Sequence, residues 1–114
     1  MILHIVLFNF KKPWSWSSNN AIEAEQATRN HPNHIKEIKG WVCGRNISRR
    51  DIAADFVVLG IFENQDELEK YIVHPNHIEG VEKWRAIANW NIVDIDLESD
   101  MSLASGYLVI LNNL

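Results

Sequence analysis

The order of strand-like and helix-like segments is the feature that most constrains how this chain can fold. Residues 2–10 carry β-branched and apolar side chains on both alternating faces, which predicts a buried strand. Residues 41–47, 56–62 and 90–97 have the same β-rich character and predict three more strands. The longer segments after the first and third strands have helical spacing instead.

Two helical regions complete this order. Asn20 is followed three residues later by Glu23, which is typical of a capping box and predicts a helix from there to about Asn30. Residues 65–73 have apolar side chains at helical spacing, and Pro75 suits the first position of a helix that continues beyond it. The order strand, helix, strand, strand, helix, strand predicts an α+β fold. It is that of a ferredoxin-like split βαβ unit, with a four-stranded antiparallel sheet and helices on one face.

Such a sheet has one face that its own helices leave uncovered. We expect this face to carry the side chains of Val6, Phe8, Phe10, Phe56 and Val58. A patch this apolar must be covered, and a second copy of the same sheet is the simplest cover. The pattern therefore predicts a homodimer whose facing sheets close into an α/β barrel.

Length, charge and cysteine content restrict the function further. A chain of 114 residues with 46% hydrophobic content suits one domain with one core. The net charge is −4 and the basic residues are scattered, so we expect no nucleic-acid partner. The first residues lack a basic leader and are too short to span a bilayer, so we expect no membrane partner. The single Cys43 cannot form an intramolecular disulfide, which favours a reducing, cytoplasmic location.

The pentapeptide His-Pro-Asn-His-Ile occurs twice, at residues 31–35 and 74–78, and a tryptophan lies six residues past each isoleucine. The two halves of the chain share little else, so we interpret the repeat as local. The first copy has no tyrosine upstream and has polar neighbours. Because the residue before a proline avoids helical backbone, we interpret this copy as an exposed break after the first helix.

The second copy is the candidate site, because it brings a phenol and two imidazoles within seven residues. His77 is expected in the first turn of the helix that Pro75 begins, where the helix dipole disfavours imidazolium and leaves a neutral proton acceptor. Tyr71 is expected on the inward face of the preceding helix, from which its hydroxyl can polarise a carbonyl beside that base. The alternative is structural, because a histidine near a helix start also serves as a cap.

His4 lies on an apolar face of the first strand, where a buried imidazole needs a hydrogen-bond partner. Asp94 on the fourth strand can be that partner, and the pair can be structural or can orient a substrate. The spacing His-x-x-His raises the possibility of a metal site. Pro75 disrupts the helical geometry and no third ligand has a suitable spacing, so we predict no metal. The sequence contains no phosphate-binding Gly-rich loop or haem motif, and no cofactor is expected.

These segments together resemble the stress-responsive A/B barrel, or Dabb, family of dimeric α+β barrels. The resemblance rests on the first strand from His4 to Phe10, on residues 44–46 and 56–62, and above all on residues 71–77 (Tyr-Ile-Val-His-Pro-Asn-His). It covers residues 1–98. The resemblance implies a ferredoxin-like subunit that dimerises through its sheet.

The resemblance also implies roles for single residues. A plant polyketide cyclase of the family closes a linear polyketide without a cofactor. By motif, its histidine base corresponds to His77 and its tyrosine to Tyr71, and His4 and Asp94 match supporting positions in the pocket. Phe56 stands where that enzyme has a polar pocket residue, so polyketide is not the expected substrate.

Three functions fit these patterns. The first is a small homodimeric barrel protein that binds a hydrophobic or aromatic small molecule in a barrel cavity. The second is a cofactor-free acid/base enzyme of the cyclase, lyase or isomerase type, with His77 as base and Tyr71 as carbonyl polariser. The third is an interaction module without a pocket. The expected binding residues are His4, His74, Asp94, Phe8, Phe56, Val58 and Trp84.

Residues 99–114 lie outside the resemblance and form a C-terminal extension. Within it, residues 107–111 are a strand-like apolar run. This run predicts an added edge strand, either within the subunit or swapped onto the partner. A loose tail is the alternative.

Overall fold

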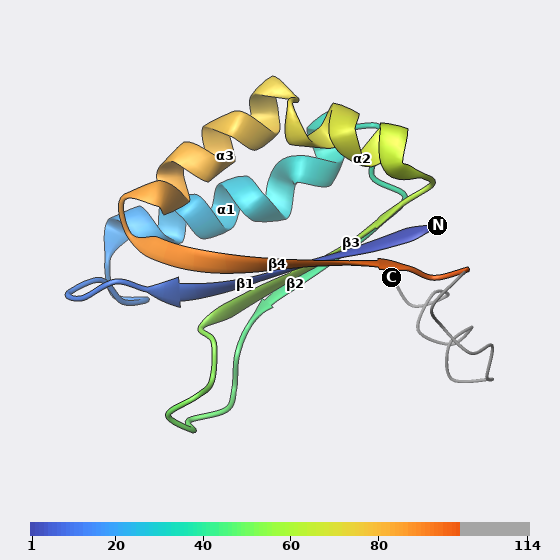
Figure 1. Ribbon diagram of the computed structural model, residues 1–114. Coiled ribbons are helices and arrows are strands. Elements are labelled where there is room, and N and C mark those ends of the chain that lie inside the picture. Colours follow the sequence, from blue (N-terminus) through green and yellow to red (C-terminus); the bar gives the residue numbers. More distant parts are fainter. Residues whose placement is uncertain (99–114) are drawn as a thin grey trace.

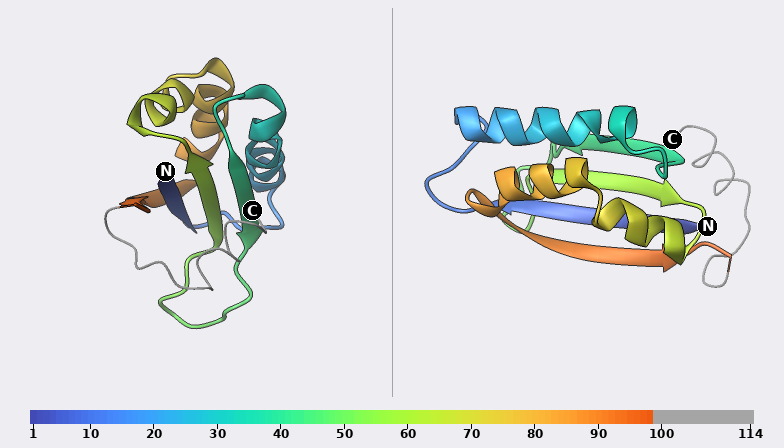
Figure 2. Two further views of the ribbon diagram at one scale, coloured as in Figure 1. Left: turned by 90° about the vertical axis from the view of Figure 1, so that its right-hand side faces the viewer. Right: turned by 90° about the horizontal axis from the view of Figure 1, so that it is seen from above.

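The structure is a computed structural model that describes residues 1–98, and this part of the chain contains four strands and three helices (Figure 1). In chain order the elements are β1 (Ile2–Phe10), α1 (Asn19–His34), β2 (Gly40–Arg45), β3 (Phe56–Phe62), α2 (Gln65–Ile72), α3 (Pro75–Arg85) and β4 (Ala88–Asp96). The strands form one antiparallel sheet in the order β2-β3-β1-β4, and the helices cover one of its faces (Figure 2). The predicted ferredoxin-like α+β fold is confirmed.

Helix α1 continues beyond the point at which the sequence predicted a break. It ends at His34, and Pro32 lies inside its last turn. A proline there removes one backbone hydrogen bond. The end of the helix is held because Ile35 is buried, with 1% of its surface exposed, and donates its backbone N–H to the carbonyl of His31 at 2.9 Å. The predicted break at the first His-Pro-Asn-His-Ile was therefore wrong.

The second copy of the motif does interrupt the helical backbone, as predicted. His74 is extended (φ −64°, ψ 134°), and Pro75 is the first residue of α3. The side chain of His74 accepts a hydrogen bond from the backbone N–H of Asn76 at 3.1 Å. This copy therefore ends one helix and caps the next.

The face of the sheet that the helices cover carries the main core. Val6, Phe8, Phe56 and Val58 are buried there, in one cluster with Ala21 and Ala24 of α1 and Trp84 of α3, and Phe10 packs against this cluster. The sheet residues of this cluster were predicted on the uncovered face, and that prediction was wrong. Alternation decides which side chains share a face, but it does not decide which face the helices cover.

The uncovered face is nevertheless apolar. The strand register places on it the side chains of Leu3, Ile5, Leu7, Val42, Val57, Leu59, Val93 and Ile95. Among these, Leu7, Val42 and Val93 are between 36% and 48% exposed. A continuous aliphatic surface of this kind favours burial against another protein surface.

Residues 99–114, with the strand predicted at 107–111, lie outside the described residues. Within residues 1–98, no helix is both long enough and apolar enough to cross a membrane.

Candidate functional site

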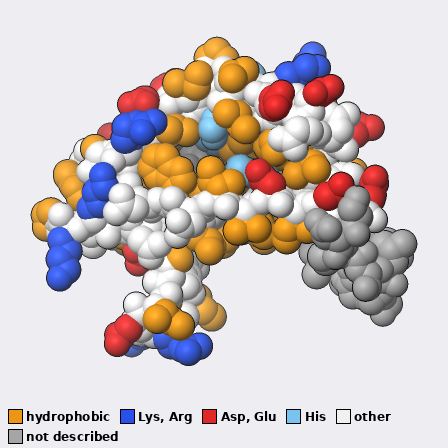
Figure 3. All heavy atoms as spheres, viewed as in Figure 1, with side chains coloured by type: hydrophobic (Ala, Val, Ile, Leu, Met, Phe, Trp, Pro, Cys, Tyr) orange, Lys and Arg blue, Asp and Glu red, His pale blue; other side chains and the backbone are white. Residues whose placement is uncertain are grey.

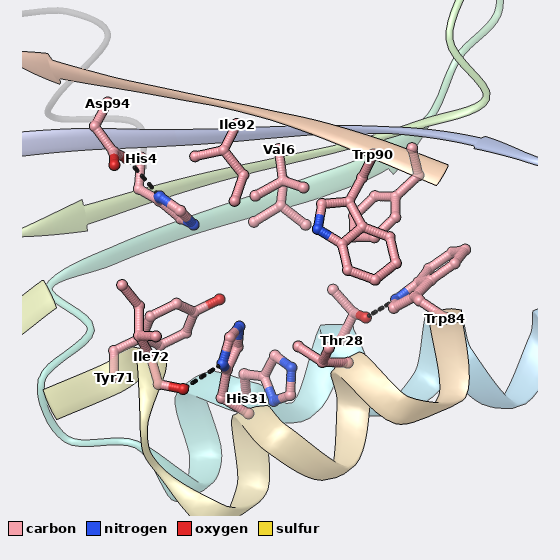
Figure 4. A pocket seen from close by; sticks show the side chains of 14 residues that line it. His4, Val6, Thr28, His31, Tyr71, Ile72, Trp84, Trp90, Ile92 and Asp94 are labelled. Carbon is pink, nitrogen blue, oxygen red and sulfur yellow. Dashed lines mark hydrogen bonds and ion pairs between the residues drawn. The ribbon is translucent and has the colours of Figure 1, made fainter. Parts of the chain in front are cut away.

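A cavity of about 190 Å³ lies between the helices and the sheet. Figure 4 shows side chains from the strands on one side of it and side chains from the helices on the other. The cavity opens beside the edge strand β4, where Ile92 is 55% exposed, and a hollow with histidine at its floor is visible above β4 in Figure 3. The lining residues are His4, Val6, Phe8, Thr28, His31, Val58, Tyr71, Ile72, His77, Val81, Trp84, Trp90, Ile92 and Asp94.

One end of the cavity is aromatic. Phe8 stacks on Trp84 with ring centres 4.2 Å apart, and Trp90 lies 5.7 Å from Phe8. Trp84 is fixed by a hydrogen bond from its indole Nε1 to the hydroxyl of Thr28 at 2.8 Å, and that hydroxyl donates in turn to the carbonyl of Ala24. A flat, apolar group can therefore lie against rigidly held rings.

Tyr71 and His77 lie together at the other end, with ring centres 4.2 Å apart. Tyr71 comes from the last turn of α2, and His77 from the first turn of α3. His77 donates from Nδ1 to the carbonyl of Ile72 at 2.9 Å, which leaves its Nε2 as an acceptor. Burial lowers the pKa of His77 to about 4, and burial followed by the charge of Asp94 raises the pKa of Tyr71 above its usual value. At neutral pH the imidazole is therefore uncharged and the phenol is protonated.

His4 and Asp94 are directly opposite each other on β1 and β4. Nδ1 of His4 lies 2.5 Å from Oδ1 of Asp94, so Asp94 is in place as the partner that the buried imidazole needs. His4 is buried at 3% exposure, and its ring packs edge-on against Tyr71 at 5.7 Å. The carboxylate holds the proton of the imidazole on Nδ1, and Nε2 is then the second acceptor in the cavity.

His31 also lines this cavity, which the sequence analysis did not predict. It is 3% exposed, and its Nδ1 lies 2.7 Å from the side-chain oxygen of Asn76 in the second motif copy. The first copy was expected to be exposed. Of its two histidines, only His34 is exposed. Thr28, His31 and Ile35 are buried at helical spacing, and this period, followed through Pro32, is the pattern that could have revealed His31.

The structure brings most of the predicted site residues together. His77, Tyr71, His4, Asp94, Phe8, Val58 and Trp84 all line the cavity. His74 and Phe56 do not. The ring of His74 caps α3, and Phe56 lies deeper in the core, stacked on Trp84 at 5.5 Å. These two residues have structural contacts in the described part of the chain, and a role for them in binding stays a prediction.

With this geometry established, the chain can be compared with known proteins. The Stress Responsive A/B Barrel Domain (Dabb) family matches residues 2–98. The chain belongs to the Dabb family. An uncharacterised protein of Streptomyces coelicolor is 34% identical over 96 residues, which are 84% of this chain and 99% of that relative. The resemblance noted from the sequence is confirmed.

Solved structures share the fold of this Dabb chain at lower identity. A dimeric ferredoxin-like protein of unknown function from Thermobifida fusca has a TM-score of 0.74 and 22% identity, over 84% of this chain and 90% of that one. A hydroxynitrile lyase from Passiflora edulis has a TM-score of 0.68 and 14% identity, over 90% of this chain and 96% of that one. At these identities the likeness concerns the fold.

Several polar atoms of the Dabb cavity have no protein partner. Among the described residues, Trp41 Nε1 is the one fully buried side-chain nitrogen or oxygen without a hydrogen bond. The second ring nitrogens of His4, His31 and His77 therefore reach open space, as does the hydroxyl of Tyr71. The lining holds no lysine or arginine, and no described group of three His, Cys, Asp or Glu residues is placed to hold a metal ion.

Proposed function

We propose that this Dabb protein is a homodimer that binds a small molecule with a hydrophobic or aromatic body in the cavity of each subunit. The apolar uncovered face of the sheet and the dimeric relative from Thermobifida fusca support the dimer. The cavity lies on the opposite, helix-covered side of the sheet. Each subunit would then hold its own ligand, and the ligand would not lie in a barrel space between the two sheets.

The observation that carries the ligand proposal is the division of the cavity into two ends. Phe8, Trp84 and Trp90 form an aromatic end, and the unpartnered atoms of the histidines and Tyr71 form a polar end. A dry cavity of about 150 Å³ is enough to bind benzene in a protein, so about 190 Å³ suits one aromatic ring with a short polar substituent. The cavity favours this function over an interaction module without a pocket.

A titration with 2-phenylethanol tests this proposal. We expect saturable shifts of the indole N–H signals of Trp84 and Trp90 in NMR spectra of the full chain. Val81→Phe fills the cavity from α3 and should weaken binding at least about tenfold. Ile78→Phe adds the same ring at an exposed position of the same helix, outside the lining, and should leave binding unchanged. Equal effects of the two variants, or no saturable binding by the wild type, would contradict the proposal.

The dimer has a separate test. Leu7→Glu places a charge on the uncovered face of the sheet and should shift the protein from dimer to monomer in light scattering at micromolar concentration. Val73→Glu adds the same charge at a position that is 67% exposed after α2, and should leave the dimer intact. A wild-type protein that is already a monomer would refute this part of the proposal.

Cofactor-free acid/base catalysis is the second candidate function. The observation that favours it is the pair formed by His4 and Asp94 beside a protonated Tyr71. In this scheme the Tyr71 hydroxyl donates to a substrate carbonyl, and an imidazole Nε2 removes a proton from the neighbouring carbon. The hydroxynitrile lyase with the same fold is a precedent for an enzyme of this architecture.

The surroundings of the two imidazoles give them different roles in this scheme. With a pKa of about 4, His77 remains a neutral acceptor but is a weak base at pH 7. The Asp94 carboxylate pairs with Nδ1 of His4 and fixes the orientation of its ring beside Tyr71. We therefore assign the base to His4 in the enzyme reading, and we assign to His77 the role of orienting the substrate.

Hydrogen–deuterium exchange at the methyl group of acetophenone tests the enzyme reading without knowledge of the natural substrate. Proton NMR in D2O should show faster exchange with the wild-type protein than with buffer. His4→Leu and Tyr71→Phe should abolish the acceleration, while His77→Leu should reduce it less. His34→Leu is the exposed control and should change nothing. Exchange no faster than in buffer would contradict this candidate.

The cytoplasm remains the location predicted from the single cysteine. Cys43 is a free thiol, and burial raises its pKa above the usual value, so it is a poor nucleophile. Cell fractionation tests the location directly.

A further inference from the structure

Three histidines from three different elements surround one tyrosine ring in the cavity. The ring centres of His77, His4 and His31 lie 4.2, 5.7 and 6.4 Å from that of Tyr71. His31 and His77 are themselves 5.7 Å apart. The first motif copy thus contributes a side chain to the same site as the second.

Each of these imidazoles has its Nδ1 paired with an oxygen atom. The oxygen belongs to the Asp94 carboxylate for His4, to the Asn76 amide for His31 and to the Ile72 carbonyl for His77. Such oxygens accept hydrogen bonds, so the proton of each neutral ring lies on Nδ1 and the lone pair lies on Nε2. The polar end of the cavity therefore offers acceptors to a ligand, with the Tyr71 hydroxyl as an added donor.

The charge of the lining also favours a ligand that donates hydrogen bonds. Asp94 is the one acidic residue among the described lining residues, which include no lysine or arginine, and burial lowers the pKa of His31 and of His77. An anionic ligand would find no positive partner and would lie near a carboxylate. An uncharged ligand with hydrogen-bond donors avoids this repulsion and can donate to the Nε2 atoms.

We propose that the cavity selects an uncharged ligand with an aromatic ring and hydroxyl groups on two adjacent carbons of the attached side chain, and that His31 accepts the second hydroxyl beside His77. This inference rests on the proposed ligand-binding function. Two hydroxyl oxygens on neighbouring carbons are about 2.8 Å apart, and each reaches about 2.8 Å further to its acceptor. The rings of His31 and His77 have centres 5.7 Å apart, so both lie within reach of one small ligand.

Helix α3 makes room for His31 at Gly80. A Cβ atom at this position would lie 2.7 Å from Cε1 and 2.8 Å from Nε2 of the His31 ring. Contacts this short are not tolerated, so any larger residue would displace the ring. The position of His31 therefore depends on Gly80 below the ring and on Asn76 at its Nδ1.

NMR titration of the full chain with three probes that share one phenyl ring tests the proposal. The probes are 1-phenyl-1,2-ethanediol, 2-phenylethanol and phenylacetate. One additional hydrogen bond should make the diol bind the wild type about three- to tenfold more tightly than the mono-alcohol. Phenylacetate should bind more weakly than either alcohol.

Substitutions in the first motif copy then identify the acceptor. His31→Leu should remove the preference for the diol, so that the diol and 2-phenylethanol bind this variant with equal affinity. His34→Leu changes the exposed histidine of the same helical turn and should keep the preference. If His31→Leu does not fold, Asn76→Ala and Gly80→Ala displace the same ring and should reduce the preference in its place.

The outcomes separate this inference from the function on which it rests. Saturable binding of 2-phenylethanol without a diol preference, a preference that survives every displacement of His31, or tighter binding of phenylacetate would overturn the inference alone. Absence of binding by all three probes would overturn both.

Discussion

The two copies of His-Pro-Asn-His-Ile share every residue and differ in structure. In the first copy, Pro32 lies inside the last turn of α1 and the helix continues to His34. In the second, His74 is extended and Pro75 begins α3. The first histidine faces the cavity in one copy and caps a helix in the other. Identical local sequence therefore leaves the roles of these histidines to their tertiary surroundings.

The copies are also in contact with each other, through His31 and Asn76 at 2.7 Å. One copy thus supplies a ring to the cavity and the other supplies the oxygen that orients this ring. The tryptophans that follow the two copies also differ in their hydrogen bonding. Trp84 is buried with its indole N–H bonded to Thr28, whereas the buried N–H of Trp41 makes no hydrogen bond within residues 1–98.

The largest effect is expected at these tryptophans. Trp84→Ala should lower the free energy of unfolding by about 3–5 kcal/mol, because it empties the centre of the core. Trp41→Phe should change it by less than about 1 kcal/mol, since it removes an unsatisfied N–H and keeps a ring in place. Urea unfolding followed by far-ultraviolet circular dichroism measures both. Equal losses would show that the two tryptophans are equivalent after all.

The next largest difference in unfolding free energy is expected between the two histidines of the first copy. His31→Ala removes a buried ring and its bond to Asn76 and should cost about 1–3 kcal/mol of unfolding free energy. His34→Ala is the control and should stay within about 0.5 kcal/mol of the wild type. The same urea titration measures both variants, and a silent His31→Ala would indicate that its burial contributes nothing.

The pH dependence of stability should reveal the buried imidazoles. The pKa of His77 is about 4 in the folded chain and about 6.5 when unfolded, so the unfolded state binds more protons between these values. Stability is therefore complete above pH 6.5 and declines as the pH falls toward 4, by at most about 1.4 kcal/mol per pH unit for this group. His31, whose pKa is also lowered, adds to the decline.

His77→Asn should make this decline shallower, whereas His34→Asn should leave it unchanged. Urea midpoints at pH 7, 6 and 5 give the comparison. An identical slope for His77→Asn and the wild type would refute the depressed pKa of His77.

The prolines should give the smallest effects, with opposite signs. Pro32→Ala restores a backbone N–H inside α1 and should stabilise the protein by up to about 1 kcal/mol. Pro75→Ala removes a residue preorganised for the first position of α3 and should destabilise it by about 0.4–1 kcal/mol. Thermal unfolding of both variants compares the signs, and a shared sign would contradict the different placement of the two prolines.

Much of the fold followed from local patterns. The order of strands and helices, the inward position of Tyr71 and the contact between His4 and Asp94 depend on periods of 2 and 3.6 residues and on antiparallel pairing, all of which are written along the chain. The errors arose where distant segments meet. The face that the helices cover and the burial of His31 depend on how α1 and α3 pack on the sheet.

The sequence by itself determined the ferredoxin-like topology, the Dabb membership and the pairing of Tyr71 with His77, because these depend on spacing within short segments. Only the tertiary structure decided that His31 of the first motif copy lines the same cavity and that its ring is held by Asn76. It also decided that the cavity lies under the helices. The physical reason is that burial and hydrogen-bond partners are properties of packed surfaces. Two identical pentapeptides acquire different partners once α1 and α3 pack on the same face of the sheet.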